Sequence, residues 1–573
     1  MIPSYRRELV TRHSPLATLP KLVTRHLPLV TAFLLVTCHS SLVTASGQTF
    51  PTPDYFRQVV HQAPLPTQVR GPEALRDYVA DGKLRLTLED AVRLALLNNT
   101  DVRVNQLQIE GAKYGVLGAY APFDPSFLTN FSSNRSSSPA TNLLQGVGET
   151  VATTLTSLSQ QSSSTYSQTF ETGTNLSIQF AGSKGDTNNS YYFYNPFLSA
   201  SLNLQFTQPL LRNRGLFPNR APIVIARRSL EQSRENFEAQ VSSTLQQVIG
   251  AYWGVVLARE SLKVSRTSLD QAEQSYQHDK RSLELGALPP LDIYRSESQV
   301  AQRRVQVIQQ EYVLKQAEDQ IRPLIGADLD PFIRALDLDL VENPEPKGEL
   351  LTIDAKTALD QALQHRPEFQ ALEQQLLNDD TSLRLAHNSL LPDLELTGLY
   401  ASNGIGGNLL NPPLPVIPGG FGDALSQMWG FGYPTYGFTL SLNLPLRNRS
   451  AAAKLGQASV QKRSDLYQVR RENQAVSLEV FSSVHQLEQA KLSLEAAKVA
   501  LDLAQKNLEA EQRKYELGSE TIFFVLEAQT ELAQVEVSLV QAEIAYQMAV
   551  TAVDHATGEL LDHHHVQFSS LTP

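Results

Sequence analysis

Two long stretches of the sequence share one seven-residue apolar repeat, which limits the fold more than any other feature. The first runs from about residue 222 to 285 and the second from about 450 to 517. The repeat consists of Val255, Leu262, Leu269, Tyr276 and Leu283, and then of Leu487, Leu494, Leu501, Leu508 and Tyr515. A strict seven-residue repeat favours left-handed supercoiled helices. A helix of about 65 residues at ~1.5 Å per residue is ~100 Å long, so we expect helices that are too long for a compact domain.

Shorter helical patterns flank both long ones and predict the packing. They cover 87–120 and 291–325 around the first long helix, and 352–388 and 523–558 around the second. Each is about half as long, so two laid end to end match one long helix. Thr87, followed three residues later by Asp90, has the spacing of a helix cap. We therefore predict two tandem repeats of one plan, residues 86–326 and 351–560, with a linker near the equator at 327–350.

Alternating apolar and polar residues predict strands in each repeat. Residues 199–214 and 436–449 alternate and then finish alike, in Arg-Asn-Arg. The Ser/Thr-rich segment 132–168 is interpreted as a long loop. Residues 126–131 and 175–180 alternate as well, which leaves the exact strand count of the first repeat open. One pair of strands per repeat gives about four strands per chain, too few to close a membrane barrel, which has at least eight. Three chains under cyclic symmetry would supply a 12-stranded membrane β-barrel joined to a trimeric barrel of helices.

The N-terminus has the order of an export signal. Basic residues precede the apolar run 27–37, and Val43 and Ala45 fit a small-residue cleavage site. We expect a signal peptide at 1–45, with a lipoprotein signal lipidating Cys38 as the alternative. The proline-rich segment 46–85 is predicted to be an extended lead-in, and 561–573 a C-terminal tail.

Over residues 86–560 the chain resembles the TolC-like outer-membrane efflux protein family. The resemblance rests on the duplicated plan, on QPLLRNRG at 208–215 and PLRNRS at 445–450, and on the tip sequences ELGALPP and ELGSE. It implies a homotrimer in the cell outer membrane that extends into the periplasm. It also implies a passive channel docked to a periplasmic adaptor (membrane fusion) protein and an inner-membrane transporter, without cofactor or catalysis. Drug efflux, metal efflux and protein secretion share this plan.

The resemblance also assigns roles near the tips. Adaptor docking is expected through two short turns, Leu285, Gly286 and Ala287 in the first repeat and Leu517, Gly518 and Ser519 in the second. The family's acidic periplasmic mouth is only partly kept, since Phe524 replaces one acid. We expect a mixed mouth of Asp292, Arg295, Phe524 and Glu527. The alternative is that Asp292 and Glu527 are solvated first-turn acids favoured by the helix dipole.

Other functions have little support in the composition. The net charge is −11, which gives no basic surface for nucleic acid, and the chain has one cysteine. We find no nucleotide-binding glycine pattern and no metalloprotease motif, and the run Asp-His-His-His at 562–565 is interpreted as polar tail rather than a metal site. The competing interpretation is a structural periplasmic coiled-coil protein without a pore, which does not explain the alternating strands.

Overall fold

The computed structural model describes residues 69, 71–141, 154–189, 191–285, 291, 293–346, 348–410, 415–517 and 519–566. Contacts divide the chain into Met1–Arg70 and Gly71–Pro573, and the described helices and strands all belong to the second unit. The predicted signal peptide, Cys38 and most of the lead-in lie outside the described residues.

Two long helices organise this unit and confirm the seven-residue pattern. They are α5 (Leu216–Glu284, 69 residues) and α11 (Arg449–Glu516, 68 residues). Helix α5 begins six residues before Pro222. Along α11, Leu487 and Leu494 are buried against α12 (Ile522–Thr557), and the small residue Ala490 is buried between them. None of the described helices is long and apolar enough to cross a membrane.

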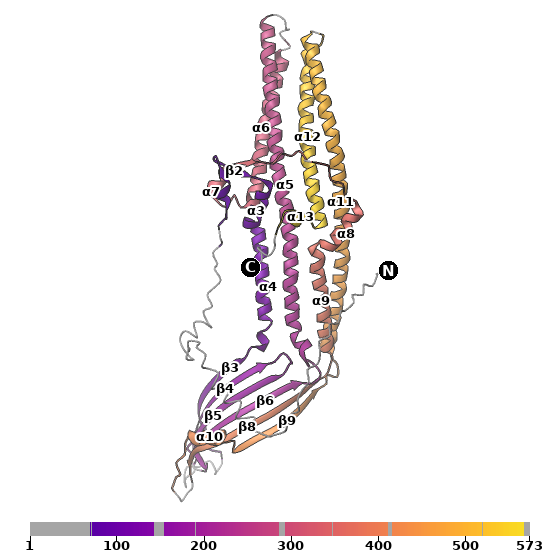
Figure 1. The fold of residues 1–573 in the computed structure, drawn as a ribbon. Helices are drawn as coiled ribbons and strands as arrows, with labels where there is room; N and C mark the ends of the chain where they lie inside the picture. Colours follow the sequence, from indigo (N-terminus) through magenta and orange to yellow (C-terminus); the bar gives the residue numbers. More distant parts are fainter. Residues whose placement is uncertain are drawn as a thin grey trace, which may run out of the picture. The chain divides into compact units, whose positions relative to one another are not determined.

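Shorter helices cover the two long ones end to end (Figure 1). Helices α3 (Leu88–Asn98) and α4 (Thr100–Gly118) follow the half of α5 near the large sheet, and α6 (Ile293–Ile325) follows the other half. Helices α8 (Ala355–His365) and α9 (Pro367–Asn388) lie beside α11, as does α12. The capping box of Thr87 and Asp90 is confirmed.

Two of the predicted half helices are interrupted by one residue each. Asn99 stands between α3 and α4 with φ −61° and ψ 127°, and its side chain accepts from the N–H groups of Asp101 and Val102. Arg366 stands between α8 and α9 with φ −68° and ψ 126°. A residue before proline favours such extended dihedrals, and Pro367 follows Arg366. Each interruption thus has a local chemical cause.

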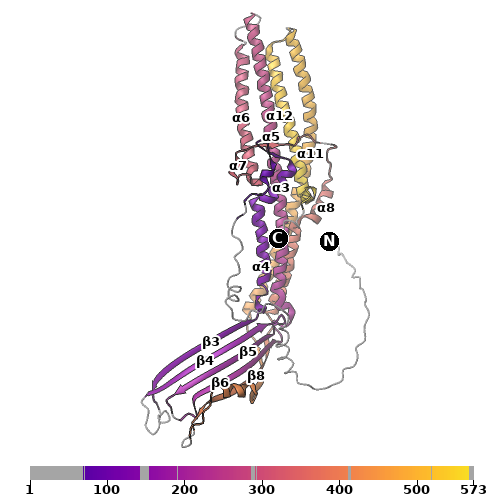
Figure 2. The same ribbon diagram turned by 60° about the vertical axis from the view of Figure 1, so that its left-hand side comes forward.

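At one end of the helices lies one antiparallel sheet with the strand order β3-β4-β5-β6-β8-β9 (Figure 1), of which Figure 2 shows β3 to β8 from another side. Its strands are β3 (Ser126–Pro139), β4 (Thr154–Thr169), β5 (Asn175–Thr187), β6 (Tyr194–Pro209), β8 (Asp393–Leu409) and β9 (Tyr433–Asn443). The prediction of about four strands was wrong, because the described part of this sheet has six. The sum of twelve strands for three chains therefore does not follow from it.

The two extra strands come from the segment interpreted as a long loop. Residues 132–168 contain the outer part of β3 and most of β4. Serine and threonine occupy both faces of these strands, so the sequence shows little apolar alternation. Hydroxyl pairs link the strands instead, including Thr129 with Ser164 (3.2 Å) and Ser136 with Ser157 (2.8 Å). Strand formation here depends on backbone pairing, which the hydrophobic pattern does not report.

The sheet has one apolar and one polar face. One row of directly paired residues crosses all six strands on the apolar face: Phe127, Tyr166, Ile178, Leu204, Tyr400 and Tyr436. The adjacent row, on the opposite face, reads Leu128, Thr165, Gln179, Asn203, Ala401 and Thr435. Successive residues of a strand point to opposite faces, so the two rows belong to two different environments.

A short helix, α10 (Phe421–Trp429), packs on the apolar face. Gly404 of β8 makes the approach possible, since a Cβ at this position would lie 1.9 Å from the carbonyl oxygen of Ala424. The Ser402 hydroxyl donates to the Met428 carbonyl at 2.6 Å. Helix α10 therefore covers part of the apolar face and leaves the polar face open.

A second, three-stranded sheet lies beside α5, where the lead-in and the linker meet. Strand β2 (Lys83–Leu86) pairs with β1 (Val79–Ala80), after η1 (Leu75–Tyr78), and parallel with β7 (Asp337–Leu340), after α7 (Pro331–Arg334). Its buried residues Leu84 and Leu86 join the core around Tyr252 of α5. Two other short helices complete the fold, η2 (Ala121–Phe123) and α13 (Leu560–His563). The lead-in and the first part of the linker are thus attached to the first long helix, whereas Leu350 at the end of the linker packs against α11 and α12.

Candidate functional site at the helical tips

The turns at the far ends of α5 and α11 each place an exposed leucine at the tip. Leu285 follows α5 and is 84% exposed, and Leu517 follows α11 and is 78% exposed. Their N–H groups donate to the carbonyls of Arg281 and Arg513, which ends both helices in the same way. The predicted tip residues Gly286, Ala287 and Gly518 lie outside the described residues. Exposed leucines at both turns are suited to contact with another protein.

Ser519 closes the second turn. Its N–H and its hydroxyl both donate to the Lys514 carbonyl, each at 3.0 Å. The turn therefore satisfies one of the last carbonyls of α11 with a side chain as well as the backbone.

The predicted mouth residues Arg295 and Glu527 lie in one groove between the start of α6 and the start of α12. Tyr294 and Gln299 line it from α6, and Phe523 from α12. The remaining lining residues are Ser298, Gln302, Leu526 and Thr530. Asp292 lies outside the described residues. The structure thus brings together two of the four predicted residues.

Phe523, which the sequence analysis did not single out, contacts both Arg295 and Phe524. The Arg295 guanidinium lies 6.0 Å from the centre of the Phe523 ring, within cation–π range. Phe523 in turn meets the predicted Phe524 edge-on, with 5.4 Å between ring centres. Both phenylalanines are about half exposed. Aromatic surface from α12 and a cation from α6 are therefore combined at this position.

Behind this groove, hydrogen bonds join α6 to α12. Gln299 donates to the Thr530 hydroxyl at 3.1 Å, and the Arg303 guanidinium donates to the same oxygen at 2.7 Å. Arg303 is buried, which lowers the pKa of its guanidinium. An isolated buried charge is costly, so Thr530 and Gln306, its second partner, stabilise this junction.

A buried carboxylate lies near the tips, and the sequence analysis missed it. Asp279 of α5 is fully buried, close to Ser296 of α6 and Tyr515 of α11, with His278 Nδ1 3.7 Å from one of its oxygens. Burial raises the pKa of Asp279, against the lowering effect of these neighbours. The signal for it was present, because Asp279 continues the seven-residue spacing of the small residues Ala258, Ser265 and Ala272 along α5. Asp279 therefore lies where α5, α6 and α11 meet.

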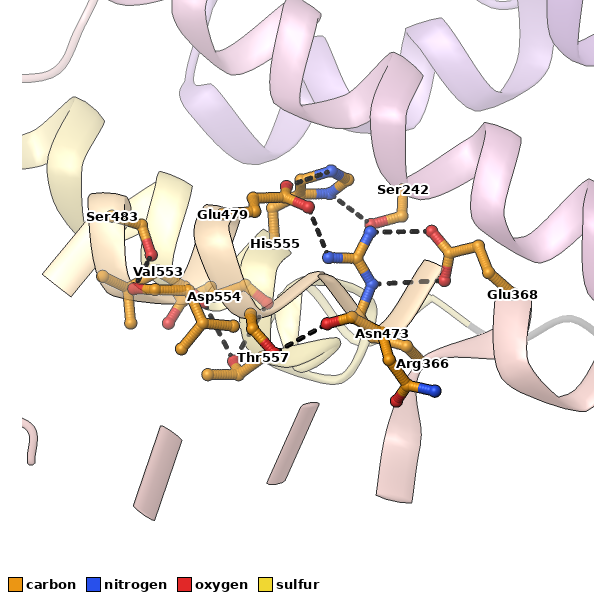
Figure 3. Close-up of polar contacts among 12 residues, drawn as sticks. Ser242, Arg366, Glu368, Asn473, Glu479, Ser483, Val553, Asp554, His555 and Thr557 are labelled. Atoms are coloured by element: carbon orange, nitrogen blue, oxygen red, sulfur yellow. Dashed lines mark hydrogen bonds and ion pairs between the residues drawn. The ribbon is translucent and has the colours of Figure 1, made fainter. Parts of the chain in front are cut away.

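In the middle of the helical region, a buried charged cluster joins four helices (Figure 3). The Arg366 guanidinium contacts Glu368 of α9 at 2.8 Å and Glu479 of α11 at 2.6 Å. His555 of α12 lies 3.6 Å from Glu479 and 2.9 Å from the hydroxyl of Ser242 on α5. Burial lowers the pKa of His555. The cluster fixes the interruption between α8 and α9 to the neighbouring helices.

Closer to the large sheet, two carboxyl groups share a buried position between α9 and α11. Asp379 and Asp465 are both almost completely buried. Burial, followed by the hydrogen bond and the charge of Asp465, raises the pKa of Asp379 to about 6. Asp465 accepts from Gln375 and Gln461.

No cluster of three or more metal-ligand side chains occurs in the described part of the chain. In the Asp-His-His-His run, His563 lies 3.0 Å from Asp554.

Comparisons with known proteins agree on one family. The family model described as "Outer membrane efflux protein" matches residues 91–327 and 358–559. The chain is 24% identical to the probable efflux pump outer membrane protein TtgC of Pseudomonas putida over 236 residues, 41% of this chain and 43% of TtgC. It is 23% identical to the outer membrane efflux protein BepC of Brucella suis over 348 residues, 60% of this chain and 69% of BepC. The chain thus spans less than half the length of TtgC.

Solved structures share the fold. The outer-membrane channel OprN matches with a TM-score of 0.58 and 16% identity, over 82% of this chain and 90% of OprN. The CmeC outer membrane channel of Campylobacter jejuni matches with a TM-score of 0.58 and 15% identity, over 87% of this chain and 90% of CmeC. CusC matches with the same TM-score over 86% of this chain and 95% of CusC, at 16% identity.

Proposed function

Because the chain belongs to the outer membrane efflux protein family, we propose that it forms a passive outer-membrane channel of an efflux or type I secretion system. The observation that carries this proposal is the large sheet with one apolar and one polar face, joined directly to helices of ~100 Å. An apolar face suits lipid, and a polar face suits a water-filled passage. A structural coiled-coil protein has no use for such a sheet.

The channel is proposed to be a homotrimer. In the described part of one chain the sheet is open and has two free edges, and a membrane excludes unpaired backbone groups. Cyclic repetition would close both the sheet and the layer of helices. The proposed tandem repeats, 86–326 and 351–560, gain support from the equivalent order of helices around each long helix. The first repeat carries two more strands than predicted.

The tips are proposed to dock onto a periplasmic adaptor protein, which links the channel to an inner-membrane transporter. The exposed Leu285 and Leu517 support this role, because apolar side chains at the ends of two helical hairpins can enter grooves of a partner. Energy for transport would come from the transporter, so the channel itself would carry out no reaction. TtgC, as its name says, belongs to an efflux pump.

The start of α12 is proposed to form the closed mouth. Phe524, Glu527 and Arg295 lie where α6 and α12 begin, next to the turns. Threefold symmetry would bring three copies of this arrangement around one axis.

For the N-terminus, we propose export with cleavage after Ala45. SilC of Salmonella typhimurium, a 27% identical relative over 155 residues (27% of this chain, 32% of SilC), is named a probable outer membrane lipoprotein, which keeps lipidation of Cys38 as the alternative.

Particle imaging of the full chain, extracted in detergent from outer membranes, tests the proposal. A threefold assembly with a detergent belt around the sheet, and ion conductance after reconstitution in planar bilayers, is the expected result. A belt-free, non-conducting rod would overturn the channel and favour the structural coiled-coil protein. Mass spectrometry of the mature N-terminus decides between cleavage and lipidation.

A further inference from the structure

The two edges of the large sheet have complementary directions. Strand β3 runs from α4 away from the helices, and β9 runs back toward α11, so the first and last strands of the order are antiparallel. Every neighbouring pair within the sheet is also antiparallel. Adding a second copy at either edge would therefore continue the same up-and-down arrangement.

We propose that three copies of this chain close an eighteen-stranded ring, in which the outer edge of β3 pairs with the outer edge of β9 in the next copy. This inference rests on the proposed trimeric channel and adds which strands meet and how wide the ring is. Edge strands present unpaired N–H and C=O groups, and in a bilayer each must find a partner. The edge of β3 is matched by the edge of β9 and by nothing else in the described part of this sheet.

The side chains at the two edges also match. Phe127 and Phe131 of β3 lie on the apolar face and are each 70% exposed. On β9, the same face carries Phe438, 80% exposed, and Leu440 and Leu442, which are also exposed. Aromatic and aliphatic pairs across neighbouring strands stabilise a sheet. Pairing β3 with β9 would place these apolar side chains next to one another across the junction between two copies.

The extra hairpin, formed by β3 and β4, has the length and composition of membrane-spanning strands. A transmembrane strand needs roughly 9–11 residues. Strand β3 has nine uncharged residues from Ser126 to Asn134 before Arg135, and β5 has nine from Asn175 to Ser183 before Lys184. Strand β4 contains no charged residue. Strands β3 and β4 are therefore long enough to span a membrane, as β5 is.

The charges at the ends of these spans lie at nearly the same height. Lys184 is paired with Gln160, and Gln160 with Ser133, so Arg135 lies only two residues beyond the row of Lys184. Both basic residues belong to the apolar face. Charged side chains on the lipid face are tolerated near the interface and costly at the midplane. Because Arg135 and Lys184 lie at nearly the same height, β3 and β5 would cross the membrane at the same level.

The pairing of β4 with β5 leaves the hairpin no freedom to stand apart from the ring. It extends from Ser157–Thr187 to Thr169–Asn175 without a shift in register. Because barrel diameter grows about linearly with strand number, eighteen strands give a ring about 1.5 times as wide as twelve. Hydroxyl and amide side chains would line it, among them Ser163, Gln179, Asn203 and Thr439.

Cysteine cross-linking in outer membranes tests which strands meet. Asn130→Cys or Ser132→Cys in β3 is combined with Thr435→Cys, Thr439→Cys or Ser441→Cys in β9, all on the polar face, with each single variant as control. The matched competitor set places Ser177→Cys or Gln179→Cys in β5 together with the same β9 positions. Oxidised dimers and trimers in the β3–β9 set alone are expected.

Cross-links in the β5–β9 set would overturn the inference, since β5 would then be the edge of a twelve-stranded ring in an intact channel. Imaging of the wild-type trimer provides the second measurement, which decides even where no pair cross-links. Eighteen strands in the ring support the proposal, and any other number refutes it. Absence of a trimer and of conductance would instead refute the proposed function.

Discussion

The Arg303 guanidinium donates to the Thr530 hydroxyl across 2.7 Å and so joins α6 to α12 behind the tips. This contact links the two helical hairpins of one chain where the mouth is proposed to open. Opening the mouth requires these hairpins to move apart or to slide. The strength of this junction should therefore influence how often the channel is open.

Replacing Thr530 with alanine should increase the open time of the channel. Arg303 and Gln299 lose their common partner, and a buried donor left unpaired costs about 1–3 kcal/mol. Single-channel recording in planar bilayers measures the effect. Thr551→Ala is the matched control, because Thr551 also lies on α12 but its hydroxyl donates to the Gln547 carbonyl within the same helix. Equal open times in both variants would contradict a role for the junction.

Truncation of the mouth residues should raise conductance. Phe524→Ala removes aromatic bulk, and Glu527→Gln removes a charge that three chains would bring together around the axis. We expect a larger conductance in the first variant and reduced cation selectivity in the second. Leu466→Ala, an exposed position on α11 far from the tips, is the control. Wild-type conductance and selectivity in both mouth variants would place the constriction elsewhere.

Loss of Arg366 should destabilise the middle of the helical region. Arg366→Met leaves Glu368 and Glu479 without their common partner, although Glu479 keeps some access to solvent. We expect a loss of about 1–3 kcal/mol, seen as a lower thermal unfolding temperature in detergent. The exposed pair of Lys506 and Asp502 supplies the control, since Lys506→Met should have little effect. Comparable unfolding temperatures for the two variants would argue against a stabilising cluster.

The carboxyl pair between α9 and α11 should make stability depend on pH. The pKa of Asp379 is raised to about 6 in the folded chain from an ordinary value of 3.8. The folded state therefore binds more protons than the unfolded state between these values, and stability falls as pH rises through this window. Asp379→Asn should raise the unfolding temperature at pH 7 and flatten its change between pH 4 and 7.

The control for this prediction is Asp502→Asn on the exposed surface of α11, which should leave the pH profile unchanged. A steeper profile in Asp379→Asn than in the wild type would reverse the sign and refute the interpretation.

The helices could be predicted because their apolar residues are periodic. The extra strands and the helix interruptions were missed because their residues show no such period. The apolar repeat of α11, such as Leu487 and Leu494, is set by helix packing, and so it located the helix. Strand β4 has serine and threonine on both faces, and its pairing with β5 depends on backbone hydrogen bonds that leave no trace in hydrophobicity. Helix interruptions were missed as well, although Pro367 signals one of them directly.

At the tips, the sequence located the turns but not the contacts around them. Arg295 and Glu527 reach one groove because α6 and α12 lie side by side, which no local pattern encodes. Phe523 was passed over because it is one of two adjacent phenylalanines, and only the position of Arg295 distinguishes it. Asp279 was missed because it continues the spacing of small residues such as Ala272, a pattern typical of helix packing.

The up-and-down order of the sheet has a consequence for how such channels can diverge. Among the described residues, strands occur in even numbers between α4 and α5 and between α9 and α11, so the chain returns each time to the end of the sheet at which it entered. Because a hairpin adds two strands, the number stays even, and a whole hairpin can be inserted without reversing the direction of any later helix. Bore and length can therefore evolve separately, with the width of the passage set by hairpin number and its reach by the heptads.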